Sequence, residues 1–383
     1  ETGVKLVVKG AGHDYKGRSN APDSLLVWTE KMRDATYVPN FRIAGAAPGT
    51  PGRPAISAQA GARWIEGYTA AAKARRYIQG GGCTTVGMAG GFIQGGGYGS
   101  FSKRFGTGAG GVLEFEVVTA DGKVRIANEA QNRDLFWALR GKIAASSDAA
   151  FKELLTKFVA FFPGALNNPT WGEQIAVKGD NSLEFFMTFL DLTEAEARAT
   201  WRPLIDELKT RPGDFSLDMR YFSAPFHDVW TAAAWEKREP GFVKLDTRPD
   251  AVPGHYWIGA NDDEVAAFLD TYQSRWIPRR LFEPAGAATL VKTLFDASRH
   301  VAVRMQINKG LDGAAPEARA RDRKTSIHPA VFDASTIIII SVRHKHVFPG
   351  IPGYEPDLAE GRRITRKVDR AMKIIRDATP ESA

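Results

Sequence analysis

The chain has a single cysteine, Cys83, among its 383 residues, and it has no long hydrophobic run. One cysteine excludes an intramolecular disulfide and a zinc site built from several cysteines, so the thiol is either a small buried hydrophobe or a reactive group. The longest aliphatic run, IIIIS from Ile337, is far shorter than the roughly 20 residues that span a bilayer. We therefore expect no disulfide, no metal site and no membrane partner.

The chain also lacks a concentrated patch of one charge. Its formal net charge is +7, but lysine and arginine alternate with acidic residues, as in RARDRK from Arg319 to Lys324. No basic stripe is interleaved with aromatic residues, so the charges indicate a solvated surface and no nucleic-acid partner. With 43% hydrophobic residues, the chain is long enough for two or three globular domains.

The first part of the chain is rich in glycine and in short β-type runs. We expect strands at Val4–Val8, Ser24–Trp28 and Val112–Ala120. The dipeptide Asp121-Gly122 follows the third run and predicts a hairpin, because this pair readily takes the positive φ of a tight turn. A helix is expected from Arg63, so the region is α+β.

From Ala144 onward the pattern changes to amphipathic helices alternating with strands. The segment 146–164 predicts a helix whose apolar residues recur at helical spacing: Phe151, Leu154, Leu155, Phe158, Val159 and Phe162. A second helix is expected over 261–278, with Val265, Phe268, Leu269, Tyr272 and Trp276 inward and Pro278 as its end. Strands are expected over 182–190, 300–307 and 335–342. This alternation predicts a sheet covered by helices.

The most glycine-dense stretch surrounds the cysteine. GGGCTTVGMAGGFIQGGGYG, from Gly80 to Gly99, contains ten glycines. Such a cluster serves to reach positive φ, to let two backbones touch, or to let a backbone approach a ligand closely. The stretch lacks the strand, turn and long helix of a dinucleotide-binding unit, and no P-loop lysine follows it.

A second glycine-bearing segment precedes it in the chain. In VVKGAGHDYKGRS, from Val7 to Ser19, a β-type run enters a Gly-Ala-Gly turn that is followed by His13. Such a histidine is either a loop residue bonded to Asp14 or a carbonyl, or a group that faces a ligand. With a lone cysteine in another glycine-rich loop, the two side chains can act as nucleophiles toward one ligand.

These segments, in this order, resemble the FAD-linked oxidases of the berberine-bridge-enzyme-like group, within the vanillyl-alcohol-oxidase flavoprotein superfamily. The first flavin segment of that group is matched by KGAGHDYKGRS, the second by the Gly80–Gly99 stretch, and a third by NRDLFWALRG, from Asn132 to Gly141. A weaker likeness continues through WGEQ from Trp171, YQSRWIP from Tyr272 and FPGIPGYEPD from Phe348. The resemblance covers most of the chain.

The resemblance implies an α+β fold of two domains. Residues 1–141 would form an FAD-binding domain of the PCMH type, and residues 142–383 a substrate domain with an antiparallel sheet covered by helices. Three departures stand out. Gly141 is followed by KIAASSDAAF, which we interpret as a helix start where relatives have a flavin-facing strand. Gly110 stands where relatives often have Asp. An N-terminal part and a closing segment typical of the family are expected to be missing.

The resemblance also implies a flavin bound by two covalent bonds. His13 would bond the 8α-methyl carbon of the isoalloxazine ring, and Cys83 would bond C6. Backbone amides of Gly10, Ala11 and Gly12 would hold the pyrophosphate. Further contacts with FAD are expected from Asp14, Thr85, Val86, Gly87, Gly90, Gly91, Gly95, Gly97, Tyr98 and Gly99.

The catalytic base is less readily identified. HYWIGAND offers His255 and Tyr256, WGEQ offers Glu173 and Gln174, and SVRHKHVFPG offers Arg343, His344 and His346. We select Tyr256 and His344 as candidate bases or substrate-binding residues. For each of these residues a purely structural role is the alternative.

The implied reaction is an oxidation. A small-molecule substrate, which is an alcohol, a sugar or a secondary metabolite, would give a hydride to flavin N5, and oxygen would reoxidise the flavin to yield hydrogen peroxide. One alternative is a flavin dehydrogenase that uses another acceptor. The other is a binding or scaffold protein that kept the fold without flavin, which the departure after Gly141 suggests. Relatives are often exported, so the resemblance favours a secreted or periplasmic location over a cytoplasmic one.

Overall fold

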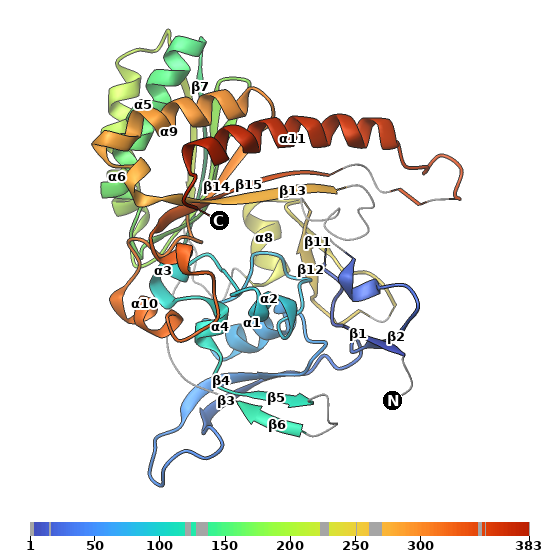
Figure 1. Cartoon of the computed structure of the whole chain (residues 1–383). Helices are drawn as coiled ribbons and strands as arrows, with labels where there is room; N and C mark the ends of the chain where they lie inside the picture. The colour runs from blue at the N-terminus through green and yellow to red at the C-terminus, as the bar shows by residue number, and fades with distance from the viewer. Residues whose placement is uncertain are drawn as a thin grey trace.

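The computed structural model describes most of the chain, in residues 4–14, 17–118, 124–127, 137–222, 230–249, 251–259, 270–343, 347–348 and 350–382. Small sheets and short helices from the first part of the chain form one region, and a large sheet with long helices forms the other (Figure 1). The two regions pack directly on one another.

The first region contains three pairs of strands. β1 (Lys5–Lys9) runs parallel to β2 (Ser24–Trp28). β3 (Ala35–Phe41) pairs antiparallel with β4 (Arg53–Ala58), and β5 (Phe115–Val118) with β6 (Val124–Ala127). The pairing of β5 with β6 confirms the predicted hairpin, whose Asp121-Gly122 turn lies outside the described residues.

Short helices connect these strands. α1 (Trp64–Lys73) buries Trp64, Ile65, Tyr68 and Ala71. The glycine-rich stretch and the residues after it form three single-turn helices: α2 (Gly91–Gln94), α3 (Ser102–Phe105) and α4 (Gly108–Gly111). A 3-10 turn, η1 (Arg18–Asn20), follows the His13 segment.

The large sheet has the strand order β10-β7-β9-β8-β14-β15-β13, and its described pairings are antiparallel. Its strands are β7 (Trp137–Ala145), β8 (Trp171–Lys178), β9 (Ser182–Phe189), β10 (Phe215–Phe222), β13 (Asp270–Pro278), β14 (Val303–Gln306) and β15 (Ala334–Arg343). In the described chain, four long helices cover one face: α5 (Asp148–Ala165), α6 (Glu194–Lys209), α9 (Pro284–Ser298) and α11 (Leu358–Ala378). The predicted antiparallel sheet covered by helices is confirmed.

Helix α5 shows why this layer forms. Its six predicted apolar residues, from Phe151 to Phe162, are all fully buried against the sheet and neighbouring helices. Ser147 caps the helix by accepting a hydrogen bond from the Ala150 N–H at 3.2 Å. A continuous apolar stripe of this kind stabilises the helix through packing more than through its intrinsic propensity.

Elements from the second half of the chain also reach into the first region. α8 (Ala232–Arg238), β11 (Val243–Leu245) and β12 (Tyr256–Ile258) lie beside α1 (Figure 1). α10 (Pro316–Asp322) contacts α3 and α4. Two 3-10 turns lie between elements of the second region: η3 (Arg279–Leu281) follows β13, and η4 (Pro329–Phe332) precedes β15. The first region is therefore completed by residues distant in the sequence.

Two sequence-based expectations are wrong. Residues 270–278 form strand β13 and not the second half of the predicted helix, while residues 261–269 lie outside the described residues. Every second polar residue of β13 bonds a side chain in or just after α11: Thr271 bonds Thr365, Gln273 bonds Asp369, and Arg275 bonds Thr379. Trp276 is buried as predicted, but Tyr272 is 46% exposed.

The second error concerns the residues after Gly141. Strand β7 continues through this glycine to Ala145, and the helix begins only at Asp148. β7 pairs with β9 and β10 along its length, so sheet pairing extends the strand past the point where a helix start was expected. β7 also crosses the domain boundary expected at Gly141.

Buried polar side chains join the two regions. Lys103 donates from Nζ to Asn167 Oδ1 at 2.7 Å and to the carbonyl oxygens of Asp312 and Ser335 at 2.5 and 3.2 Å. Desolvation lowers the pKa of Lys103 to about 7, and the negative charge of Asp312 opposes this effect. The buried amino group of Lys103 thus links α3 to three segments of the second region.

A second link lies at Gly110. The Asp322 carboxylate accepts a hydrogen bond from the Thr107 N–H at 2.8 Å, and burial raises its pKa. A Cβ on Gly110 would lie only 1.9 Å from Asp322 Oδ1. The carboxylate of a distant residue therefore occupies the space beside the glycine where relatives often have Asp.

We predict that Gly110→Ala lowers the free energy of unfolding by about 1–3 kcal/mol, because the new methyl group overlaps the Asp322 carboxylate. The matched control is Gly111→Ala in the same short helix, where a Cβ meets no atom within 4 Å. Urea unfolding measures both variants. The interpretation would be contradicted if both variants lost the same free energy of unfolding. It would also be contradicted if Gly110→Ala lost as much free energy of unfolding in an Asp322→Ala background as in the wild-type protein.

Candidate functional site

The side chains of His13 and Cys83 meet at one hydroxyl group. Thr85 Oγ1 lies 2.8 Å from His13 Nε2 and 3.3 Å from Cys83 Sγ. His13 comes from the turn after β1, and Cys83 comes from the glycine-rich stretch. The fold thus brings together the two nucleophilic side chains that the sequence singles out.

The two loops are held by backbone contacts. In the turn after β1, Gly12 has φ +92°, and the Gly10 carbonyl accepts a hydrogen bond from Trp28 Nε1 at 2.9 Å. A Cβ on Gly87 would lie 3.5 Å from the Ala11 backbone nitrogen, so the second loop passes close to this turn. This proximity puts Thr85 within reach of the His13 ring.

The start of α1 holds the other side of the cysteine loop. The N–H groups of Trp64 and Ile65 donate to the carbonyls of Val86 and Thr84, both at 2.9 Å. The first N–H groups of a helix have no partner within the helix, so they are available to hold a neighbouring loop. The loop 84–86 is therefore anchored by its backbone while the side chains of Cys83 and Thr85 remain partly exposed.

The glycines of the Gly80–Gly99 stretch lie in two kinds of surroundings. A Cβ on Gly82, Gly90 or Gly91 would meet no atom within 4 Å, so these residues border open space. Elsewhere the backbone is tightly packed: Gly97 has φ +72°, and a Cβ there would lie 2.8 Å from the Phe92 ring. The open glycines form a cradle that side chains would fill, which fits a flat ligand lying close to the backbone.

The large sheet touches this stretch without a side chain between them. A Cβ on Gly172 of β8 would lie 1.9 Å from the Ser100 carbonyl oxygen, and one on Gly99 would lie 2.2 Å from the Gly80 carbonyl oxygen. Asn308 donates from Nδ2 to the Gly99 carbonyl at 3.0 Å. Three backbone segments are therefore stacked where the two regions meet.

Glu173 follows Gly172 and takes an unusual backbone conformation, with φ +70°. Its carboxylate accepts a hydrogen bond from the Ser100 hydroxyl. Desolvation raises the pKa of Glu173, and the Ser100 hydrogen bond opposes this shift. A left-handed conformation is costly for a residue with a side chain, and such strain is often found at functional sites.

Two buried tyrosines share this environment. Desolvation raises the pKa of Tyr68 and Tyr77, and the charge of Glu173 adds to both shifts. The charge of Cys83 also raises the pKa of Tyr68, whose hydroxyl donates to the Gly81 carbonyl. The thiol, the carboxylate and the two phenols therefore interact within one region. No sequence motif points to these tyrosines, and the one signal is the hydroxyl group of Tyr68 on the apolar face of α1.

The other candidate residues lie in varied surroundings. Tyr256 packs in a core with Ile65, Phe101 and Trp235, and desolvation raises its pKa. Gln174 accepts a hydrogen bond from Gln306 Nε2 at 2.8 Å across the sheet.

His255, next to Tyr256, faces Glu66 with 3.7 Å between His255 Nδ1 and Glu66 Oε1. Arg343 ends β15, while His344 and His346 lie outside the described residues. The catalytic roles of Tyr256 and His344 stay predictions.

A separate cavity of about 430 Å³ lies between β3, β4, α1 and β5. Its lining includes Ile56, Ile78 and Phe105, and it includes none of His13, Cys83 and Thr85. In the described ranges, no group of three or more His, Cys, Asp or Glu residues is placed to hold a metal ion. Across the same part of the chain, no helix combines the length and apolar composition needed to cross a membrane.

Comparison with known sequences identifies the first third of the chain. Residues 1–128 match the family described as FAD binding domain. The FAD-linked oxidoreductase easE of Arthroderma otae is 43% identical over 139 residues, which are 36% of this chain and 22% of that protein. The FAD-linked oxidoreductase phmC of Phaeosphaeria nodorum is 44% identical over 146 residues, 37% of this chain and 32% of that protein. The matches span a third or less of these relatives.

Solved structures match over nearly the whole chain. The VAO-type flavoprotein MtVAO615 of Myceliophthora thermophila C1 has a TM-score of 0.69 at 22% identity and covers 99% of this chain and 67% of its own. A chitooligosaccharide oxidase has a TM-score of 0.64 at 15% identity, over 96% of this chain and 74% of its own. The chain therefore has the fold of the VAO-type flavoproteins. Within this fold, the N-terminal third of the chain matches an FAD binding domain and is similar to a part of the two FAD-linked oxidoreductases.

We predict that Glu173→Gln raises the melting temperature by a few degrees near neutral pH and has little effect in acid. Because the folded-state pKa of Glu173 is raised, the wild-type protein loses stability as pH rises above the ordinary pKa of Glu. Glutamine stays neutral and keeps an acceptor for Ser100. Thermal unfolding across this pH range checks the prediction, with Asp206→Asn on the exposed side of α6 as the control. A pH-independent difference between Glu173→Gln and wild type would show that ionisation of Glu173 is not the cause.

Proposed function

We propose that the chain is part of an FAD-dependent oxidase whose flavin is bonded to both His13 and Cys83. The observation that carries this proposal is the shared contact of the two side chains with Thr85 Oγ1. A histidine and a cysteine from separate loops that meet at one point can bond two positions of one ring. The match of residues 1–128 to an FAD binding domain supports the identity of that ring.

The residues around this point suit the rest of the cofactor. Backbone amides of Gly10, Ala11 and Gly12 would hold the pyrophosphate, since a glycine-containing turn offers N–H groups to an anion. Gly82, Gly90 and Gly91 leave room for close approach to the backbone. When bound, FAD supplies the acceptor for a hydride from the substrate.

The substrate proton needs an acceptor among the side chains of the chain. Glu173 suits this role best, because its desolvated carboxyl group has a raised pKa and lies beside Ser100 at the end of the glycine-rich stretch. Tyr256 suits it less well, since burial raises the pKa of its hydroxyl and so disfavours loss of the proton. His344 remains a candidate from the sequence.

The substrate is proposed to be an alcohol, a sugar or a secondary metabolite, with oxygen as the second substrate. The chitooligosaccharide oxidase among the structural neighbours supports a hydroxyl-bearing substrate. A dehydrogenase is the second candidate, because another neighbour with the same fold, Phl p 4, is described as a grass pollen allergen with glucose dehydrogenase activity. The argument for a flavin-less protein is weaker, since strand β7 occupies the residues where a helix start was expected.

We predict that the purified protein is yellow and keeps its flavin after acid precipitation. Cys83→Ala should retain flavin through His13, His13→Ala should retain it through Cys83, and the double variant should release it on denaturation. Visible absorbance of the precipitate and intact mass measure attachment. Release of flavin from the denatured wild-type protein would disprove covalent attachment, and complete release from either single variant would disprove the two-bond assignment.

An oxidase and a dehydrogenase differ in the product formed from the electron acceptor. With a panel of alcohols and oligosaccharides in air, an oxidase forms one hydrogen peroxide for each substrate oxidised, as a peroxidase-coupled assay measures. Turnover that requires an added dye and forms no peroxide would establish the dehydrogenase alternative.

A further inference from the structure

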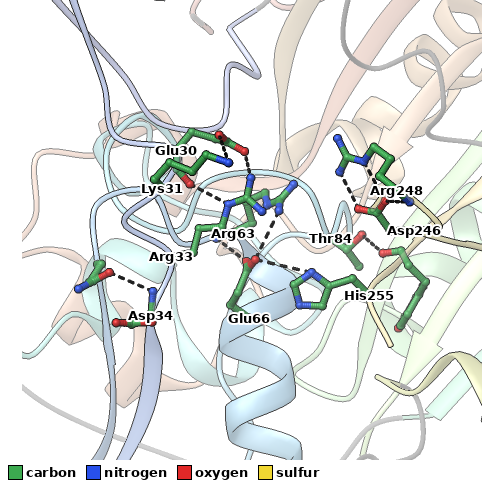
Figure 2. Close-up of polar contacts among 12 residues, drawn as sticks. Glu30, Lys31, Arg33, Asp34, Arg63, Glu66, Thr84, Asp246, Arg248 and His255 are labelled. Carbon is green, nitrogen blue, oxygen red and sulfur yellow. Dashed lines mark hydrogen bonds and ion pairs between the residues drawn. The ribbon is translucent and has the colours of Figure 1, made fainter. Parts of the chain in front are cut away.

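Glu66 and His255 form a buried pair behind the cysteine loop (Figure 2). Glu66 lies in the first turn of α1, where its Oε2 accepts a hydrogen bond from the Arg63 N–H at 2.8 Å. Its Oε1 faces His255 Nδ1 at 3.7 Å, and the two side chains are only 9% and 7% exposed. The pair is therefore shielded from water, so a positive charge on His255 would act on the Glu66 carboxylate with little screening.

Several charged groups surround this pair. Arg63, one residue before α1, lies 3.6 Å from Glu66 Oε1, and Arg33, which pairs with Glu30, approaches from the segment before β3. Asp246, after β11, is paired with Arg248. Desolvation lowers the pKa of His255, Arg63 and Arg33 lower it further, and Glu66 and Asp246 oppose them. His255 is therefore neutral at neutral pH, and acidification creates an imidazolium beside the Glu66 carboxylate.

The same two elements hold the cysteine loop. On one side, the first N–H groups of α1 bind the carbonyls of Thr84 and Val86. On the other side, the Thr84 hydroxyl donates to the Tyr256 carbonyl of β12 at 2.9 Å. Tyr256 directly follows His255, and Thr84 directly follows Cys83. The loop is thus held between α1 and β12, and the Glu66–His255 contact joins these two elements next to it.

We propose that Glu66 and His255 are positioning residues that keep α1 and β12 together around the loop and so determine how the Cys83 thiol is presented. They act through the contacts that α1 and β12 make with Thr84 and Val86. The effect on flavin attachment rests on the proposed function. The effect on the reactivity of the thiol toward a reagent in solution does not. Protonation of His255 tightens the pair, so the thiol is held more firmly in acid than at neutral pH.

The first test measures the reactivity of the Cys83 thiol in His13→Ala molecules that carry no flavin, because a bond from Cys83 to flavin would leave no thiol to alkylate. Intact mass distinguishes these molecules from those with attached flavin. Alkylation of Cys83 by N-ethylmaleimide is followed by mass spectrometry across a pH series, and each rate is divided by that of the parent protein. We expect Glu66→Gln and His255→Ala to change the rate several-fold, with the largest ratio in acid. His255→Gln, which keeps a donor for Glu66, should restore the parent rate at neutral pH but not in acid.

The matched control is Arg248→Gln, which alters the neighbouring Asp246 pair at a side chain that is 62% exposed. It should leave the alkylation rate unchanged. Circular dichroism checks that each variant is folded. If His255→Ala does not fold, Glu66→Gln alone tests the proposal. Ratios that are equal for all variants, or that do not depend on pH, would overturn the proposal.

The second test measures flavin attachment in the same His13→Ala background, where Cys83 is the only proposed bond. Glu66→Gln and His255→Ala should reduce the attached fraction several-fold, and Arg248→Gln should not. If no variant and no parent protein holds flavin while the alkylation rates respond as expected, the proposed function fails and the positioning role stands. If flavin attaches equally in every variant and alkylation is unaffected, the positioning role fails and the proposed function stands.

Discussion

Direct backbone contact between the glycine-rich stretch and strand β8 is the constraint on which the rest of the structure depends. The absence of side chains at Gly99 and Gly172 lets three backbone segments stack, with the Ser100 carbonyl against Gly172. This contact brings the large sheet against the loop region that carries Cys83, and it puts Glu173 beside Ser100. A larger residue at either glycine would separate the sheet from the loops, so the site and the packing of the two regions depend on the same atoms.

Much of this arrangement follows from local sequence. The apolar stripe of α5 predicts its buried face, and the resemblance of the His13 and Cys83 segments to flavin segments implies that both side chains face one ligand. Their shared contact through Thr85 could not be predicted, because it depends on the approach of two loops that are far apart in the chain. The charge pattern of α1 likewise gives no sign that Glu66 would meet His255.

The failures have a common physical origin in contacts between distant residues. The apolar spacing that ends in Tyr272 and Trp276 predicts a helix, but residues 270–278 pair with β15 as strand β13, and Gln273 bonds Asp369 of α11, about a hundred positions away along the chain. Asp322 fills the space at Gly110 from a position beyond the reach of any local pattern. The φ of +70° at Glu173 is likewise invisible to local patterns, since local preference opposes it; in the fold this residue bonds Ser100.

The buried Lys103 has a consequence for the order in which the protein folds. Its ammonium is satisfied by oxygens of Asn167, Asp312 and Ser335, and the last two follow it by 209 and 232 residues. During synthesis α3 therefore cannot reach its final packing until the ribosome has released residues near 335, since an unsatisfied buried charge is too costly. The packing of α3 thus depends on residues that are made late in synthesis, although α3 itself lies in the part of the chain that is made early.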